Sequence, residues 1–403
     1  MNKMTIQSFA RAQQNNIFHL VFCIVTSLGV FFGGLWAGVA IGGGLLVALA
    51  RGLSGEGWAW PPRQILIVVA LFLAAVWLSC LHAVDPDVAI HGALKMTTVL
   101  IPLSLLFLPL SEEALITIRR KTLLYLLLAA ICMAILSGFI IYLTVMDLFS
   151  PYITKFNRGF SYMAILIWPL WAFLLAGPKA LPERGSQRYF ILVSLCVFLF
   201  AAFANHSKTS ALGIFFAMAT FCFTYWKPRL ACGFVLGATL FFLALPWWIG
   251  DVFPLIHAPS DGGLSSAWHR LEIWDYLHYY LVQDLSFLHG WGIANTSFLP
   301  VAGPHAAPYR YAIDPAAHPH NAAMQIWGET GLPGVLAFLY MIYIALNGIL
   351  SLPERARPFA WAAYVMSLIL IMSAYNFWTD SLWAALALTA VCFGLLTKER
   401  AGN

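Results

Sequence analysis

Charged residues are scarce in this chain. Lys, Arg, Asp and Glu make up only 10% of its 403 residues, whereas soluble globular domains carry about 25%. Hydrophobic residues make up 61% and aromatic residues 15%. This composition excludes an ordinary soluble domain and predicts an all-α polytopic membrane protein.

Cysteine is missing where an extracellular domain would use it. All seven cysteines fall in or beside predicted helices, and the one long polar segment has none. The sequence therefore supports neither a disulfide framework nor a cysteine-type zinc site. An internal repeat of fixed period and a low-complexity tract are also absent.

Apolar runs long enough to cross a bilayer, about 20 residues each, recur along the chain. We predict about twelve membrane helices with approximate bounds: 17–32, 34–50, 64–82, 89–110, 122–146, 160–177, 189–204, 209–226, 230–250, 333–350, 359–376 and 381–397. The first two form one run from Ile17 to Ala50. As a single helix this run would span about 51 Å, against a bilayer core of about 30 Å. It must therefore break, and we predict the break at Gly33-Gly34.

Lys and Arg are unevenly distributed between the two sides of this topology. With a cytoplasmic N-terminus, sixteen fall in inside loops, five fall in outside loops, and Lys95 lies within a helix. The outside five are Lys155, Arg158, Lys208, Arg270 and Arg310. Because cytoplasmic loops are enriched in Lys and Arg, both termini are predicted to be cytoplasmic. The net charge of +5 then reflects topology and implies no nucleic-acid partner.

Only one stretch is long enough for a separate polar region. We divide the chain into N-terminal membrane helices, a long outer polar segment that is expected to carry the functional residues, and C-terminal membrane helices: 1–250, 251–330 and 331–403. Within the middle segment, apolar residues recur at helical spacing, at Leu271, Trp274, Leu277 and Leu281. This predicts an amphipathic helix over 269–285 near the membrane surface.

The polar segment ends in HPHNAAMQIWGETGLPG, from His318 to Gly334. Its histidines, Asn321 and Glu329 lie beside a predicted membrane helix, where ionisable residues are most often functional. His318 and His320 are two residues apart, so an extended segment would point both rings to one side. Zinc binding is therefore one interpretation, although a third ligand is not evident. A structural histidine is another.

The outer cations suit a lipid-linked diphosphate, whose charge must be neutralised near the headgroups. Lys208 lies among three hydroxyl residues at a predicted helix N-terminus, where hydroxyls and free N–H groups add anion donors. Arg158 and Arg270 are further candidates. For Lys155 and Arg310, pairing with acidic residues or snorkelling is the competing interpretation.

The polar motifs resemble those of the O-antigen ligase family, within the wider group of O-antigen ligases and polymerases. His320-Asn321 is followed by nine residues and then by Gly331-Leu332-Pro333-Gly334, a spacing similar to that of the ligases. Arg270 followed by Gly290-Trp291-Gly292 resembles the family's periplasmic helix and its Gly-x-Gly turn.

Two shorter segments carry the same resemblance. NHSKTSALG resembles the family's Ser-Arg segment at the head of a helix, with Lys208 in place of arginine. This departure keeps the charge but loses bidentate geometry. Arg158-Gly159 resembles the basic site before the family's sixth helix.

The resemblance implies a metal-independent glycosyltransferase with a GT-C-like fold in the inner membrane of a Gram-negative bacterium. Its donor would be an O-antigen glycan on undecaprenyl diphosphate. Its acceptor would be a hydroxyl of the lipid A–core oligosaccharide at the periplasmic face. Such a transfer needs a base for the acceptor hydroxyl and cations for the leaving diphosphate.

We expect His320 to be the base, with Arg270 and Lys208 as catalytic cations, no cofactor, and inversion at the anomeric carbon. Substrate contacts are expected from Arg158, His318, Asn321, Glu329, Lys155 and Lys95. Glu329 could instead cap the tenth helix. Which of the two histidines takes the proton stays open at this stage.

Two other functions compete with the ligase. An O-antigen polymerase would use the same donor and a second lipid-linked glycan as acceptor, but the His-Asn and Gly-x-x-Gly spacing favours the ligase. A transporter of a lipid-linked sugar would spread polar residues along both halves of the membrane or show inverted repeats. This chain instead gathers them on the outer side.

Overall fold

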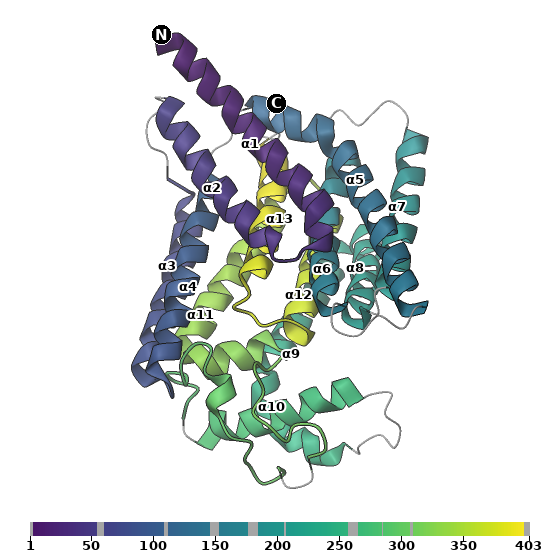
Figure 1. Cartoon of the computed structure of the whole chain (residues 1–403). Coiled ribbons are helices and arrows are strands. Elements are labelled where there is room, and N and C mark those ends of the chain that lie inside the picture. Colours follow the sequence, from purple (N-terminus) through teal and green to yellow (C-terminus); the bar gives the residue numbers. More distant parts are fainter. Residues whose placement is uncertain are drawn as a thin grey trace.

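The computed structural model describes residues 3–54, 60–108, 112–145, 153–175, 184–204, 207–256, 265–283, 285–306 and 309–398. Every regular element in these ranges is a helix (Figure 1). The α-helices are α1 (Lys3–Phe31), α2 (Leu35–Ser54), α3 (Arg63–Ser79), α4 (Pro86–Ser104), α5 (Glu112–Val145), α6 (Ile153–Leu175), α7 (Arg184–Ala204), α8 (Lys208–Trp226), α9 (Pro228–Val252), α10 (Ser265–Gln283), α11 (Ala322–Ser351), α12 (Arg357–Ser373) and α13 (Asp380–Lys398). Short 3-10 turns cover Cys80–His82, Leu105–Phe107, Phe253–Leu255 and Thr296–Phe298.

The helices have the lengths and composition of a polytopic membrane protein. Among the described residues, eight helices are long and apolar enough to cross a bilayer. Four shorter apolar helices add to them: Asn16–Phe31, Val193–Ala204, Arg357–Ser373 and Asp380–Leu396. Large apolar side chains such as Leu49, Phe203 and Phe234 are exposed on the bundle, as expected where lipid replaces water. The all-α membrane fold is thus confirmed, and the number twelve stays a prediction.

The predicted break between the first two helices is confirmed. Helix α1 ends at Phe31 and α2 begins at Leu35. The turn packs tightly on α6, because a Cβ atom at Gly33 would lie 2.7 Å from Cβ of Arg158. On the other side, a Cβ at Gly159 would lie 2.3 Å from the Val30 carbonyl oxygen. The two glycines therefore allow the close approach that fixes Arg158 beside the α1–α2 turn.

Helix α6 is the central helix of the bundle. Its apolar window is 89% buried, against 22–39% for the other seven long apolar helices. It packs against α1, α5, α12 and α13, so it has almost no face left for lipid. It starts at Ile153, earlier than the predicted 160, and Arg158 therefore lies inside the helix.

Helix α10 lies at the end of the molecule opposite to both chain termini (Figure 1). We call this the α10 end. A second apolar core forms there, where α10 packs on α9. The amphipathic helix is confirmed, but its covered face is centred on Ile273, Tyr276 and Leu277, while Leu271 and Trp274 are only half-buried.

Helix α11 starts much earlier than expected. It begins at Ala322 rather than at 333, and the Asn321 side chain caps it by accepting a hydrogen bond from Met324 N at 3.0 Å. At Gly331 the backbone turns to φ 62° and ψ −159°, which kinks the helix. The polar sequence between Asn321 and Gly331 is thus the buried first part of α11 and not a loop.

Candidate active site

The loop that carries the two histidines is tied to α10 at three places. The buried carboxylate of Glu272 accepts hydrogen bonds from the backbone N–H groups of residues 310, 311 and 312, at 2.9, 2.8 and 2.8 Å. Tyr276 Oη accepts one from Ala316 N at 3.0 Å, and Trp274 Nε1 donates one to the Pro319 carbonyl at 2.7 Å. Helix α10 therefore holds residues 310–319 as a fixed wall.

His320 has an unusual backbone and a fixed ring. Its φ is 55°, a left-handed value that non-glycine residues seldom adopt and that is often found at functional sites. Nδ1 lies 3.0 Å from the carbonyl oxygen of Ala374. Since a carbonyl can only accept, Nδ1 carries the proton, and Nε2 of the neutral ring carries a lone pair.

The surroundings of His320 keep its ring neutral. Burial lowers its pKa below the ordinary 6.5. The hydrogen bond to Ala374 acts in the opposite direction, and the positive charges of Arg270 and His269 lower the pKa further. Near pH 7 His320 is therefore a neutral imidazole with an available Nε2, which is the form that a general base requires.

His318 is beside His320, with the two ring centroids 4.1 Å apart. Burial lowers the pKa of His318 to about 4, helped by the charge of His320 when that ring is protonated and by the charges of Arg158 and Arg270. Because the charges of Arg158 and Arg270 both act on this ring, α6 and α10 place their guanidinium groups within electrostatic range of His318. The structure thus gathers four of the expected site residues: Arg158, Arg270, His318 and His320.

The two arginines are positive charges without a described carboxylate partner. Burial lowers the pKa of Arg270, which is half-buried, while Arg158 is exposed. Across the described ranges, neither has an Asp or Glu oxygen within 4.0 Å. Guanidinium groups left open in this way bind carboxylates and phosphates well, often through two parallel hydrogen bonds.

Asn321 and Glu329 are buried, and protein groups satisfy their side chains. Asn321 caps α11 and donates to the Met372 carbonyl at 3.0 Å. Glu329 accepts from Ala294 N at 2.8 Å, from Thr296 Oγ1, from Gln325 and from Trp378 Nε1. Asn321 thus caps the start of α11, whereas Glu329 does not, and neither side chain has a described hydrogen bond to the His320 ring. Their described contacts instead hold neighbouring segments in place.

The two glycine motifs lie against each other. A Cβ atom at Gly331 would lie 2.7 Å from Gly290 N, and one at Gly328 would lie 2.0 Å from the Trp291 ring. Trp291 N also donates to the Gly328 carbonyl at 2.7 Å. The Gly290-Trp291-Gly292 turn and the kink in α11 therefore form one packed unit, and side chains at these positions would separate them.

Residues 374–379 form the loop between α12 and α13. Several site residues bind this loop, and the sequence does not predict it. Ala374 O binds His320, and Asn376 and Phe377 bind the Gln325 amide at 3.0 and 2.8 Å. Trp378 donates to Glu329. The sequence shows a polar break at this point, but no local pattern could reveal partners about fifty residues away.

A chain of hydroxyl groups connects this loop to Lys208. Tyr375 donates to Ser161 Oγ at 2.7 Å, Ser161 lies 2.6 Å from Ser210 Oγ, and Ser207 donates to Ser210 at 2.8 Å. Lys208 starts α8 as expected and its side chain is exposed. The neighbouring serine hydroxyls thus bind one another and join α8 to α6.

The charges that act on the two histidines, as far as the structure describes them, include neither Lys95 nor Arg310. Lys95 is exposed on α4 and its Nζ lies 3.5 Å from the Trp378 carbonyl oxygen, which puts it beside the 374–379 loop. The Lys155 side chain lies outside the described residues. Arg310 is exposed on the fixed wall. Among the described side chains, no group of three His, Cys, Asp or Glu is placed to hold a metal ion.

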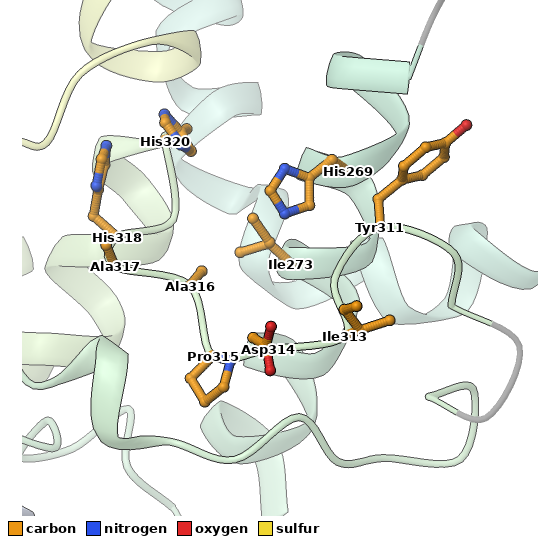
Figure 2. Close-up of a pocket in the computed structure, with 10 residues that line it drawn as sticks. All are labelled: His269, Ile273, Tyr311, Ile313, Asp314, Pro315, Ala316, Ala317, His318 and His320. Carbon is orange, nitrogen blue, oxygen red and sulfur yellow. The ribbon is translucent and has the colours of Figure 1, made fainter. Parts of the chain in front are cut away.

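The histidines line a cavity of about 360 Å³ between α10 and the fixed wall. Figure 2 shows His318 and His320 on one side of it, the His269 ring directed toward them from α10, and Asp314 near the bottom of the view. This volume is at the lower end of the range for ligand pockets, about 300–1,000 Å³. The cavity can therefore hold one small polar group beside the base.

Residues 191–339 match the family model described as O-antigen ligase. Over this region the chain is similar to the O-antigen ligase family. Its matched region contains Lys208, Arg270, the two site histidines and both glycine motifs. Arg158 and the 374–379 loop lie outside it, although the structure places both at the same site.

Several curated relatives carry the name "Putative polysaccharide ligase". The one from Rickettsia conorii is 26% identical over 334 residues, which cover 79% of this chain and 76% of the relative. The proteins from Rickettsia typhi and Rickettsia prowazekii are also 26% identical, over 76% of this chain and 75% of each relative. This similarity to polysaccharide ligases supports an O-antigen ligase-type activity on polysaccharide substrates at a membrane.

Proposed function

We propose that this chain belongs to the O-antigen ligase family and transfers a glycan from undecaprenyl diphosphate to a hydroxyl of the lipid A–core oligosaccharide. One observation carries the proposal: His320, a neutral histidine with a fixed tautomer, lies beside His318, on which the charges of Arg158 and Arg270 act, and neither arginine has a described carboxylate partner. A base next to an anion site is what attack on a sugar diphosphate requires.

The proposed reaction is a single displacement. Nε2 of His320 accepts the proton of the acceptor hydroxyl, whose oxygen forms a bond to the anomeric carbon. The bond from that carbon to the diphosphate oxygen breaks, and the diphosphate leaves with the electron pair. Arg270 and Arg158 stabilise the developing negative charge, and the anomeric configuration inverts.

The remaining expected residues take supporting roles in this proposal. Lys208 lies at the head of α8 and attracts the diphosphate toward Arg158, which lies on α6, the helix that the hydroxyl chain joins to α8. Lys95 acts similarly from α4. Asn321 and Glu329 position the His320 loop and the 374–379 loop. The α10 end faces the periplasm of a Gram-negative inner membrane, with both termini in the cytoplasm.

A reconstituted transfer reaction tests the reaction class. Purified protein in lipid nanodiscs is mixed with undecaprenyl-diphosphate-linked glycan, lipid A–core and EDTA, and products are separated on a gel. We expect glycan-capped lipid A–core at an undiminished rate, because arginines provide the positive charge. Loss of product with EDTA, restored by Mg²⁺, would contradict the metal-independent mechanism. Longer lipid-linked glycan without capped core would identify a polymerase.

A further inference from the structure

The cavity beside His320 has two chemically different ends. His318 and His320 lie at one end, where the positive charges of Arg158 and Arg270 act on His318. Asp314 and Tyr311 lie toward the other end, on the fixed wall (Figure 2). A ligand that enters this cavity therefore meets at one end the two histidines, next to which the arginine charges act, and at the other end a carboxylate.

Asp314 is held on a rigid support. Glu272 fixes the backbone up to Ala312, and Tyr276 fixes Ala316, so Asp314 lies between two anchored points. Its side chain is exposed, and within the described parts of the chain it has no hydrogen bond or ion pair. A free carboxylate on a preorganised loop is the kind of group that provides specificity in a ligand pocket.

The charge of Asp314 decides which part of the substrates it suits. A carboxylate repels a diphosphate, so the phosphate groups belong at the arginine end. Ionised carboxylates are acceptors only, and they form strong hydrogen bonds with hydroxyl donors. The Asp314 end therefore suits a neutral group with several hydroxyls, which is the chemistry of a sugar ring.

We infer that the cavity wall around Asp314 is a saccharide subsite that binds the acceptor sugar and presents one of its hydroxyls to His320. This inference rests on the proposed function and adds to it the place of the acceptor. The diphosphate and the acceptor then approach His320 from opposite ends of the site. The ring of His269, directed toward the histidines from α10 (Figure 2), forms the side of the same subsite.

Steady-state kinetics with Asp314→Ala and Asp314→Asn test the subsite. The acceptor KM should rise at least about tenfold in Asp314→Ala, because a hydrogen bond to a charged group is lost. The rise should be smaller in Asp314→Asn, since an amide oxygen still accepts. The donor KM and kcat should stay within about twofold of the wild type. Asp251→Ala is the matched control, as Asp251 is an exposed carboxylate outside the cavity.

Three outcomes would overturn the assignment. A rise in the donor KM instead of the acceptor KM would mean that the donor's own sugar occupies the subsite. A fall in kcat with both KM values unchanged would give Asp314 a different role. Kinetics equal to those of Asp251→Ala would show that nothing binds at Asp314.

A binding measurement separates this inference from the proposed function. Deacylated core oligosaccharide is added to the purified protein without donor, and contact is detected by saturation-transfer NMR. The wild type should bind it and Asp314→Ala should lose the signal. Binding that depends on Asp314 in a protein without transfer activity would refute the proposed function and keep the subsite. If the wild type transfers glycan and Asp314→Ala binds the core oligosaccharide as well as the wild type does, the subsite is refuted and the proposed function is kept.

Discussion

At the scale of single residues, the structure distinguishes two histidines that the sequence leaves equivalent. His320 donates through Nδ1 to Ala374, which leaves Nε2 as the basic atom. The pKa of His318 is lowered to about 4, so this ring is neutral near pH 7 but a much weaker base. The assignment of His320 as base therefore depends on a backbone carbonyl 54 residues away, which no local pattern reveals.

The pH dependence of turnover should report the state of His320. Transfer needs the neutral ring, and the pKa of that ring is lowered mainly by burial. Activity should therefore reach half of its plateau value below pH 6.5, which is about where an unperturbed histidine titrates. Arg270 also lowers the pKa of His320, so Arg270→Gln should move the acid limb to higher pH.

The measurement is kcat/KM between pH 4.5 and 8.5 for the wild type and Arg270→Gln. If the kcat/KM of the wild type already falls above pH 7, the claim that His320 is a buried base with a lowered pKa is contradicted. If the pH at which kcat/KM falls is the same in Arg270→Gln as in the wild type, the Arg270 guanidinium does not act on His320.

At the scale of elements, the sequence predicts helix existence well and helix ends less well. The break at Gly33-Gly34 follows from the length of the apolar run, and the structure has it there. The start of α11 at Ala322 was not predictable from hydropathy, since Gln325 and Glu329 look like loop residues. They are tolerated in a buried helix because partners from distant segments satisfy them, including Trp378 and Phe377.

The kink in α11 gives a prediction for the glycine motifs. Gly331 has φ 62° and ψ −159°, a conformation almost confined to glycine, and a Cβ there would press on Gly290 N. Gly331→Ala should therefore lower the melting temperature and the transfer rate together. Gly348→Ala in the same helix is the control, because a Cβ there would meet no atom within 4 Å.

Thermal unfolding in detergent compares the two variants. Replacing a helical glycine by alanine stabilises by about 0.5–1 kcal/mol, so Gly348→Ala should melt at or slightly above the wild-type temperature. Equal melting temperatures for both variants would show that the kink does not need its glycine.

At the scale of the whole molecule, the site is assembled from segments far apart in the chain. Helix α6 provides Arg158, α10 provides Arg270, and the fixed wall provides His318. His320 follows the wall, and the 374–379 loop holds it in place. The sequence identifies the charged members because outer cations are rare in this chain. It cannot identify the loop, whose role consists of contacts with His320, α11 and α6.

The central claim is that Nε2 of His320 activates the acceptor, and single-turnover transfer tests it most directly. His320→Ala and His318→Ala are mixed with saturating donor and acceptor, and the first turnover is timed. We predict that His320→Ala slows product formation by about 10²–10⁴-fold, the usual contribution of a general base, while His318→Ala has a clearly smaller effect. A His320→Ala protein that transfers glycan at the wild-type rate would contradict the account.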